Sequence, residues 1–353
     1  MKRIGINLLY LVPGQVGGTE RYARLFIQEL ERIDQKNQYI LFCNKENYFS
    51  FVVTSKNVKK VLCPILATHR ILRIFYEQFI FPLIIVWNRC NIIHSFGYIG
   101  PIFTLAKRII TVHDTNWLDF PQDFTKTTWI VQCILSFFSI NTAHLILTDS
   151  SFSYQRICHY FPQFKNKIVI IEPWISPLFI RLLMKNSKNG IRQKDYIICV
   201  SAMYPHKRIP YLIELYNKWD MKKKYSLILI GKNGKDEEKV KNLVQSSSGI
   251  FWRKNISDEE LFSLYFEASA AVFPSVYEGY GYPVYESIAS GLPTAVGKRS
   301  LYNDSISMKL AELTGLIAID CKTLTKLVQT NKMKIQSRVV TSGKKLIQIY
   351  GKI

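Results

Sequence analysis

Short apolar segments alternate with longer segments of helical periodicity along this chain, and the alternating series occurs twice. Most of the short segments are apolar throughout, which is typical of strands in a parallel sheet that is covered on both faces. Strands that alternate with helices predict doubly wound α/β domains. The predicted strands are RIGINLLYL, YILFC, NIIHS, RIITVH, LILTD and KIVII in the first series, and YIICVS, YSLILIG, GIFW and AAVFP in the second. The sequence therefore predicts an α/β protein with two doubly wound domains.

The two series are separated by residues 176–194, whose Ser, Asn, Gly and Lys content is typical of an interdomain connection. We predict an N-terminal domain over residues 1–175, a linker over 176–194 and a C-terminal domain over 195–335. The basic tail over 336–353 is predicted to form a helix that packs back on the N-terminal domain. Because open α/β sheets bind ligands at the carboxyl ends of their strands, a site is expected in the cleft between the domains.

Composition limits the classes of partner. The 353 residues are more than one core normally holds, which agrees with two domains. The chain has 47 Lys and Arg against 26 Asp and Glu, a formal net charge of +21. This excess favours nucleic acid, an anionic membrane face or a phosphorylated substrate, although a Lys-rich and Ile-rich proteome would also produce it. The seven cysteines have no C-x-x-C spacing, which argues against disulfides or zinc and indicates a reducing compartment.

Three apolar stretches bear on membrane contact. Residues 127–148 carry no charged side chain, but a buried helix to about Ile140 followed by the strand HLILT explains them without a membrane span. The apolar run at the N-terminus is short and ends at Pro13, so it is interpreted as a first strand rather than a signal peptide. The stretch HRILRIFYEQFIFPLIIVW sets Arg70 and Arg73 beside large apolar residues, which is compatible with a surface helix at an anionic bilayer.

One loop indicates a ligand. The strand AAVFP is followed by SVYEGYGY and by a helix that we expect to begin at Pro283, because proline is favoured in the first helical turn. A helix N-terminus offers backbone N–H groups to anions, and Gly279 and Gly281 allow a close approach. Glu278 in the loop and Glu286 one turn into the helix are placed to accept hydrogen bonds from sugar hydroxyls. The loop therefore indicates a ligand with a phosphate between two sugars.

Together with segments elsewhere, this loop resembles the retaining glycosyltransferases of family 4, also described as glycosyl transferases group 1, and in particular their mannosyltransferase-like branch. The resemblance covers most of the chain, from about Ile4 to about Leu301, and it implies the GT-B fold, in which two Rossmann-like domains face each other across a cleft. The matching segments, in the family's order, are GGTERYARLFIQEL, IIHSFGY, TVHDTNWLDFPQDF, LILTDSSFS, VSAMYPHKRIPYLIELY and the loop with its Glu, seven residues, Glu spacing.

The resemblance implies roles for individual residues. Lys207 matches the lysine that neutralises the donor diphosphate, where a fixed cation stabilises the charge that grows on the departing phosphate. Glu278 matches a glutamate near the donor sugar, and Glu286 matches the glutamate that holds the nucleotide ribose. His113 matches a histidine near the donor sugar and the reacting centre. The residues alone leave other interpretations open: an exposed loop lysine, a solvated loop carboxylate, a helix N-terminal carboxylate and a structural histidine.

Five glycine-loop positions are implied to bind the donor as well. Gly279, Tyr280 and Gly281 match positions that offer backbone N–H groups to phosphate or sugar. Gly17 and Gly18 match the loop near the diphosphate from the opposite domain, although two glycines before a helix often form only a turn.

The sequence departs from the family pattern in three places. Ala202 stands where an arginine often lies beside the diphosphate; mannosyltransferase-like branches share this feature, which favours GDP-mannose as the donor. Residues 301–305, LYNDS, replace a proline and a glutamate, so contacts to the nucleotide or sugar there are in question. The segment IEPWISPLF replaces the usual asparagine and glycine turn before the linker.

The resemblance implies transfer of a hexose from a nucleotide-diphosphate sugar to a hydroxyl of a growing, lipid-linked surface glycan, with the anomeric configuration retained. The sequence offers no convincing aspartate pair for a metal, and a lysine with helix-terminal N–H groups can replace a divalent ion electrostatically, so no metal or cofactor is expected. We expect a cytoplasmic enzyme of polysaccharide or lipopolysaccharide biosynthesis that is peripheral on the inner face of the cell membrane.

Two other classes of function stay open. Ala202 and the altered LYNDS segment are compatible with a catalytically inactive homologue that binds a nucleotide sugar and acts as a scaffold. The positive charge alone suggests a nucleic-acid binder, but the sequence contains no recognisable nucleic-acid recognition module, so nucleic acid is not expected as a partner.

Overall fold

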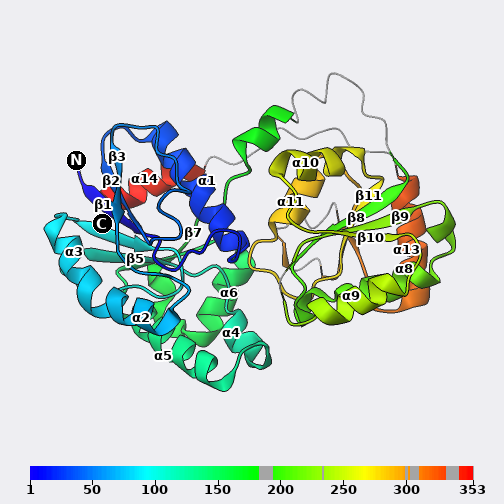
Figure 1. Ribbon diagram of the computed structural model, residues 1–353, viewed down its shortest axis with the longest axis horizontal. Helices are drawn as coiled ribbons and strands as arrows, with labels where there is room; N and C mark the ends of the chain where they lie inside the picture. Colours follow the sequence, from blue (N-terminus) through cyan, green and yellow to red (C-terminus); the bar gives the residue numbers. More distant parts are fainter. Residues whose placement is uncertain (183–193, 233, 299–300, 303–309, 331–341, 353) are drawn as a thin grey trace. The chain divides into compact units, whose positions relative to one another are not determined.

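The protein forms two compact units (Figure 1). The computed structural model describes residues 1–182, 194–232, 234–298, 301–302, 310–330 and 342–352. Unit 1 contains Met1–Trp174 and Val340–Ile353, and unit 2 contains Ile175–Val339. Each unit is built on one parallel sheet, so the predicted α/β class is confirmed.

The sheet of unit 1 has seven parallel strands in the order β3-β2-β1-β4-β5-β6-β7. In its register Ile4 pairs with Tyr39 on one side and with Ile92 on the other. The direction of winding reverses between β1 and β4, the position where doubly wound sheets bind ligands. The strands are β1 (Arg3–Asn7), β2 (Gln38–Cys43), β3 (Val58–Leu62), β4 (Ile92–Ser95), β5 (Lys107–Thr111), β6 (Leu145–Thr148) and β7 (Ile168–Ile170).

Helices cover both faces of this sheet, as two adjacent residues of β4 demonstrate. Ile93 packs in a cluster with Phe81 and Ile85 of α3, whereas the ring of His94 lies 5.3 Å from that of Phe26 in α1. Since successive strand residues point to opposite faces, α1 and α3 cover opposite faces (Figure 1). The helical segments are α1 (Gly18–Ile33), α2 (Arg70–Phe75), the π-helical turn η1 (Tyr76–Ile80), α3 (Phe81–Trp87), α4 (Asn116–Asp119), η2 (Pro121–Asp123), α5 (Lys126–Thr142), α6 (Ser151–Tyr160), η3 (Pro162–Lys167) and α14 (Ser342–Lys352).

Helix α14 belongs to unit 1 although it follows unit 2 in the sequence. Tyr350 is fully buried, and its hydroxyl lies 2.7 Å from Nδ1 of His94, whose Nε2 lies 2.8 Å from Oγ1 of Thr111. Burial, aided by the charge of His113, holds the pKa of His94 well below its usual range, so this ring is neutral. The tail predicted over residues 336–353 is described from Ser342 to Lys352, and its residues 336–341 lie outside the described part.

Unit 2 repeats the winding of unit 1 with six parallel strands in the order β10-β9-β8-β11-β12-β13. Its direction of winding reverses between β8 and β11. The strands are β8 (Tyr196–Val200), β9 (Ser226–Ile230), β10 (Ile250–Arg253), β11 (Ala270–Phe273), β12 (Thr294–Val296) and β13 (Leu310–Glu312).

The helices of unit 2 also lie on both faces of the sheet (Figure 1). On one face the Tyr265 hydroxyl of α10 donates to the Pro283 carbonyl of α11 at 3.2 Å. On the other face α8 packs between α9 and α13. The helical segments are η4 (Pro205–Lys207), α8 (Ile209–Lys218), η5 (Asp220–Lys223), α9 (Glu237–Gln245), α10 (Asp258–Glu267), α11 (Tyr282–Ala289) and α13 (Ile317–Gln329).

Part of the segment predicted as a linker packs within unit 2. The ring of Phe179 is fully buried, and its centroid lies 4.5 Å from that of Phe262 in α10. Residues 183–193 of the predicted linker lie outside the described part.

The apolar residues 127–148 form α5 and β6, as the sequence predicts. Among the described residues, no helix combines the length and the apolar character that a membrane crossing requires. The expectation of a buried helix was wrong in one respect, because apolar side chains of α5 are between 39% and 50% exposed. These are Ile130, Val131, Ile134, Phe137 and Phe138.

We expect the Tyr350→Phe variant to be less stable than the wild type. The substitution keeps the packing of the ring but leaves Nδ1 of His94 buried without its partner, a loss that costs about 1–3 kcal/mol. Urea unfolding followed by circular dichroism measures the change, with Tyr48→Phe, at a partly buried position, as the control in the same unit. An unchanged unfolding midpoint for Tyr350→Phe would show that α14 contributes nothing to the stability of unit 1 through this bond.

Candidate functional site

Two loops meet in unit 2 where the strand order reverses. Strand β8 leads to η4, and β11 leads to the loop SVYEGYGY. The backbone N–H of Val276 donates to the carbonyl oxygen of His206 at 3.0 Å. The rings of His206 and Tyr277 pack edge to face, with 6.1 Å between their centroids. The two loops are therefore joined by backbone and side-chain contacts at the carboxyl ends of adjacent strands.

Lys207 and Glu278 form an ion pair across these loops. Nζ of Lys207 lies 2.7 Å from Oε2 of Glu278, and the two side chains are only 17% and 15% exposed. The next residue, Arg208, has a left-handed backbone with φ of 53°, and its guanidinium packs over the ring of Tyr211 at 4.3 Å. The interpretation of Lys207 as an exposed loop lysine is therefore excluded. The pair places a cation and a hydrogen-bond acceptor side by side, and these groups can bind the phosphate and the hydroxyls of a phosphorylated sugar.

Gly281 determines where α11 begins. Its φ of 82° is left-handed, and the helix starts at Tyr282, one residue before the predicted start, with Pro283 in its first turn. A Cβ atom at position 281 would lie 2.8 Å from Cε1 of Tyr302, so the backbone and the neighbouring ring both require glycine. The positive end of the helix dipole consequently lies at the end of the loop that carries Glu278.

Glu286 and Tyr280 are buried, with exposed fractions of 2% and 5%. Glu286 lies one turn into α11, and the ring of Tyr280 stacks on that of Tyr285 with 4.2 Å between centroids. Because Glu286 is buried within α11, the alternative of a helix N-terminal carboxylate that the dipole favours stays open beside the predicted ribose contact. Gly279, Tyr280 and Gly281 complete the same loop, so the predicted unit 2 residues lie together around the start of α11.

Tyr302 was missed by the sequence analysis. Its side chain is 7% exposed and packs against Gly281 and, at 6.4 Å between centroids, Tyr285. Its hydroxyl has no hydrogen-bond partner among the described residues, and burial followed by the negative charge of Glu278 raises its pKa. Tyr302 belongs to the segment LYNDS, which the sequence analysis identified only as a departure from the family pattern. No sequence spacing indicates that position 302 lies against Gly281.

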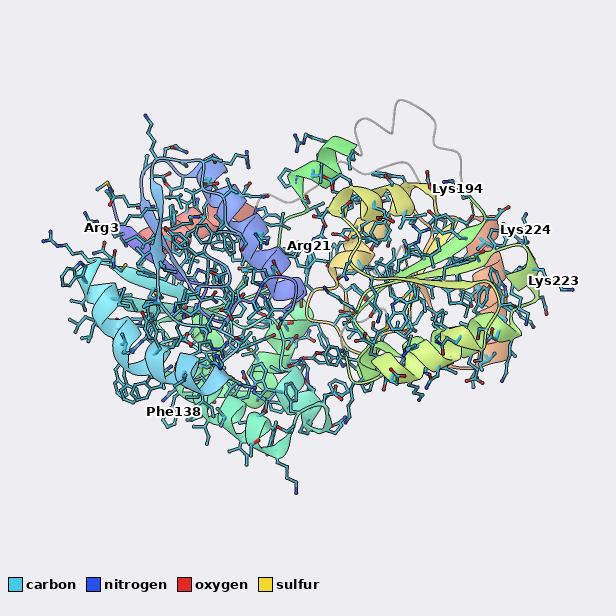
Figure 2. The ribbon with its side chains drawn as sticks, in the orientation of Figure 1. Arg3, Arg21, Phe138, Lys194, Lys223 and Lys224 are labelled. Atoms are coloured by element: carbon cyan, nitrogen blue, oxygen red, sulfur yellow. The ribbon has the colours of Figure 1, made fainter. Side chains whose placement is uncertain are left out.

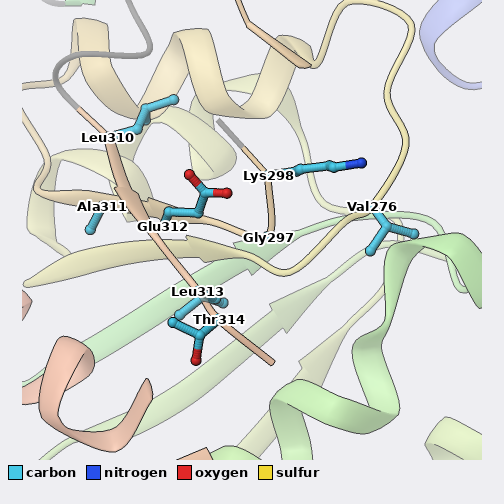
Figure 3. A pocket seen from close by; sticks show the side chains of 8 residues that line it. All are labelled: Val276, Gly297, Lys298, Leu310, Ala311, Glu312, Leu313 and Thr314. Atoms are coloured by element: carbon cyan, nitrogen blue, oxygen red, sulfur yellow. The ribbon is translucent and has the colours of Figure 1, made fainter. Parts of the chain in front are cut away.

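A cavity of about 610 Å³ opens beside the same loop. It is lined by Val276, by Gly297 and Lys298 after β12, and by residues 310–314 around β13 (Figure 3). Lys298 and Glu312 are the ionisable side chains among its described lining residues. Lys207 and Glu278 are absent from this lining, so the cavity is a neighbouring feature of the strand ends rather than the space around the ion pair.

Gly17 and Gly18 begin α1 in unit 1. Gly17 has φ of 57° and precedes the first residue of the helix, which explains glycine at this position. A Cβ atom at either position would meet no described atom within 4 Å. Because the space around both residues is open, packing does not explain why position 18 is glycine.

His113 is held at the end of β5 by two partners. Its Nδ1 lies 2.5 Å from Oδ2 of the buried Asp149, and its Nε2 donates to the Phe96 carbonyl oxygen at 2.9 Å. Burial lowers the pKa of His113, but the charge of Asp149 outweighs this effect and the pKa lies above its usual range. Asp149 follows β6 in LILTDSS and was not singled out from the sequence. Both ring nitrogens are occupied within unit 1, and the catalytic role of His113 stays a prediction.

Comparison with known sequences supports the resemblance. Residues 184–329 match the family model described as glycosyl transferases group 1. O-antigen chain mannosyltransferase B of Escherichia coli is 30% identical over 210 residues, which are 56% of this chain and 55% of that protein. O-antigen chain mannosyltransferase RfbU of Salmonella typhimurium is 25% identical over 209 residues, which are 58% of this chain and 55% of that protein. The chain thus aligns with about half the length of these relatives.

Comparison with solved structures confirms the fold. The crystal structure of Anabaena HepE in complex with UDP and glucose covers 100% of both chains with a TM-score of 0.65, at 15% sequence identity. The predicted GT-B class is confirmed by this likeness together with the two Rossmann-like sheets.

We expect the Tyr302→Phe variant to be at least as stable as the wild type. It retains the ring that packs on Gly281 and removes a buried hydroxyl that has no described partner, which relieves a desolvation cost of about 1 kcal/mol. Thermal unfolding measures the difference, and Tyr302→Ala, which leaves a cavity, should lower Tm. A clear destabilisation by Tyr302→Phe would show that the hydroxyl has a structural partner.

Proposed function

We propose that this protein is a retaining hexosyltransferase that uses a nucleotide-diphosphate sugar. The proposal is supported by the match of residues 184–329 to the family model of glycosyl transferases group 1 and by the GT-B fold. One observation supports this most strongly. The Lys207–Glu278 ion pair is held at the β8/β11 switch point, directly before the N-terminus of α11. A cation, a helix terminus and two carboxylates in one loop region suit the diphosphate and the sugar hydroxyls of such a donor.

In this proposal unit 2 binds the donor. Lys207 and the first turn of α11 stabilise the negative charge that develops on the β-phosphate as the bond between it and the anomeric carbon breaks. Glu286 accepts hydrogen bonds from the ribose, and Glu278 from the transferred sugar. The Tyr302 hydroxyl is available to the same donor, since it is buried beside Gly281.

Unit 1 binds the acceptor in this proposal. The acceptor hydroxyl oxygen forms the new bond to the anomeric carbon from the face that the phosphate leaves, and its proton passes to the departing phosphate oxygen. This exchange retains the anomeric configuration and leaves the chain with the tasks of positioning and charge stabilisation. His113, which the Asp149 carboxylate and the Phe96 carbonyl hold in place, would shape the donor-sugar side of unit 1. Gly17 and Gly18 would approach the diphosphate.

We propose mannose as the transferred sugar and a growing O-antigen-type glycan on a lipid carrier as the acceptor. Two relatives are O-antigen chain mannosyltransferases, and Ala202 matches the mannosyltransferase-like pattern. A lipid-linked acceptor would place the protein on the cytoplasmic face of the cell membrane.

Metal-free catalysis is part of the proposal. Among the described residues no three His, Cys, Asp or Glu side chains are grouped as metal ligands. Lys207 and α11 supply the positive potential that a divalent ion would otherwise supply.

We expect Lys207→Gln to bind GDP about 10- to 100-fold more weakly than the wild type, because a charge-assisted hydrogen bond contributes about 1.5–3 kcal/mol. Lys207→Arg should keep part of the affinity. Isothermal titration calorimetry measures the difference, with Lys223→Gln at the exposed edge of unit 2 as the control (Figure 2). If the wild type and Lys207→Gln bind GDP, UDP and ADP with equal affinity, the donor does not bind at Lys207.

We expect purified protein to transfer mannose from GDP-mannose with retention, at the same rate in the presence of a chelator. Nuclear magnetic resonance of the product reports the anomeric configuration, and a radiolabelled donor reports the rate. An inverted product or complete loss of activity with chelator would refute the mechanism. Donor binding without any transfer would favour the inactive scaffold instead.

A further inference from the structure

A polar cluster lies at the carboxyl ends of β1 and β4, the strands between which the winding of unit 1 reverses. We call it the Glu77 cluster, and its members are Asn7, Arg73, Glu77 and Ser95. Nδ2 of Asn7 at the end of β1 donates to Oε1 of Glu77 at 2.5 Å and to Oγ of Ser95 at 3.1 Å. Glu77 belongs to the π-helical turn η1, so this turn is fastened to the edge of the sheet where doubly wound domains bind ligands.

Asn7 and Ser95 hold the Glu77 carboxylate in place. Oδ1 of Asn7 accepts from the backbone N–H of Leu9 at 3.1 Å, so the oxygen and the nitrogen of this amide are both engaged. A Cβ atom at position 100 would lie 2.6 Å from Oγ of Ser95, and glycine there allows the serine hydroxyl to pack closely. Asn7, Ser95 and Glu77 are all buried. The carboxylate therefore has a fixed position before any ligand arrives.

Arg73 and Glu77 each keep a polar atom without a partner. They lie four residues apart, a spacing at which such side chains often pair, yet these two described side chains form no ion pair with each other. Nη1 of Arg73 donates to the Tyr10 carbonyl oxygen at 3.5 Å, whereas its Nε is buried without a hydrogen-bond partner among the described residues. Oε2 of Glu77 likewise accepts no hydrogen bond from a described residue. One donor and one acceptor are thus left over within one turn of helix.

Burial makes this arrangement costly for the chain. Burial raises the pKa of Glu77, and the charge of Arg73 and the hydrogen bond from Asn7 only oppose that rise. A buried polar group without its full set of hydrogen bonds lowers stability, so packing alone does not explain the cluster. Perturbed carboxylates and π-helical turns are both frequent at functional sites. Arg73 is only partly buried, so the cluster reaches the surface through this side chain.

The two unpartnered atoms select a class of ligand. A guanidinium only donates hydrogen bonds and a carboxylate only accepts them, whereas a hydroxyl does both. One hydroxyl can therefore accept from Nε of Arg73 and donate to Oε2 of Glu77. A phosphate would be attracted by Arg73 but repelled by Glu77, and a cation would meet the reverse. A neutral polyol such as a sugar satisfies both side chains.

Tyr10 connects the Glu77 cluster to the start of α1. Its carbonyl oxygen is the acceptor for Arg73, and its hydroxyl donates to the carbonyl oxygen of Thr19 in the first turn of α1 at 3.3 Å. A Cβ atom at Gly97 would lie 2.7 Å from the Tyr10 ring, so this ring is packed against the chain that follows β4. The cluster is therefore joined through one residue to the helix that Gly18 begins.

We propose that Arg73 and Glu77 bind a hydroxyl of the acceptor sugar, with Arg73 donating to its oxygen and Glu77 accepting its proton in a hydrogen bond. Asn7 and Ser95 position the Glu77 carboxylate for this contact. The two charged side chains orient the sugar and take no part in the proton transfer to the departing phosphate. The identification of the sugar as the acceptor rests on the proposed function, whereas the binding of a neutral sugar at this cluster does not.

A purely structural role for Glu77 makes a different prediction. In that case the carboxylate serves only to hold η1 on β1 through Asn7. Glu77→Gln keeps a side-chain oxygen that accepts from Asn7 but removes the charge. A structural role therefore predicts that this variant binds sugars as the wild type does, and the proposed site predicts weaker binding.

The experiment is saturation-transfer nuclear magnetic resonance of the full chain, without any sugar donor, titrated with the methyl α-glycosides of mannose, galactose and N-acetylglucosamine. We expect at least one of these probes to bind the wild type. Glu77→Gln and Arg73→Gln should each weaken that binding about tenfold, the loss expected for one charge-assisted hydrogen bond. Arg73→Lys should keep part of the affinity.

Matched controls lie in the same unit. Asp34→Asn changes another buried carboxylate, whose oxygens accept from the Tyr39 hydroxyl and from backbone N–H groups. Arg70→Gln changes a second arginine of α2, which donates to Gln132. Both controls should bind the probe as the wild type does. Thermal unfolding checks that every variant is folded, and Arg73→Gln, at a partly exposed position, tests the site even if Glu77→Gln lowers Tm.

Two results would overturn this site: no binding of any probe to the wild type, or wild-type binding by folded Glu77→Gln and Arg73→Gln. Failure of the proposed function has a different signature. A chain that binds a probe through Arg73 and Glu77 but transfers no sugar contradicts only the function. In an active chain, Glu77→Gln should raise KM for the acceptor about tenfold and leave KM for the donor unchanged. Transfer with an unchanged acceptor KM contradicts only the site.

Discussion

The candidate site depends on the ion pair between Lys207 and Glu278. Each residue belongs to a loop that follows a different strand, and the Val276–His206 backbone hydrogen bond holds the two loops at one place. The pair has limited contact with water, so the attraction between the two side chains holds each of them in position. A lysine fixed in this way needs little rearrangement when an anionic ligand arrives, which is the basis of electrostatic preorganisation.

Glycine and tyrosine build the site around this pair. Gly281 sets the left-handed turn that ends the loop and starts α11, and its missing Cβ leaves room for the ring of Tyr302. Tyr280 and Tyr285 stack beside it. Glu286 is buried one turn later. The two carboxylates and the cation of this region have little exposure to water, and electrostatic interactions are stronger where water is excluded.

Local patterns were sufficient to predict most of the fold and part of the site. The wholly apolar strands indicated two parallel sheets, and the position of Pro283 located the start of α11 to within one residue. The partners of His113 and the place of Tyr302 could not be predicted, because they depend on contacts between segments far apart in the sequence: Asp149 is brought to His113 by neighbouring strands, and Tyr302 packs on Gly281 from a different loop. The exposed side of α5 was also missed, since an apolar run without charge has the same pattern whether its side chains are buried or exposed.

The most direct test is a crystal structure of the protein with an intact nucleotide-diphosphate mannose. The account predicts that Nζ of Lys207 lies about 3 Å from a diphosphate oxygen, that the diphosphate faces the first turn of α11, and that Glu286 accepts hydrogen bonds from the ribose. A donor bound elsewhere, with the Lys207–Glu278 pair unchanged and remote from it, would contradict the central claim.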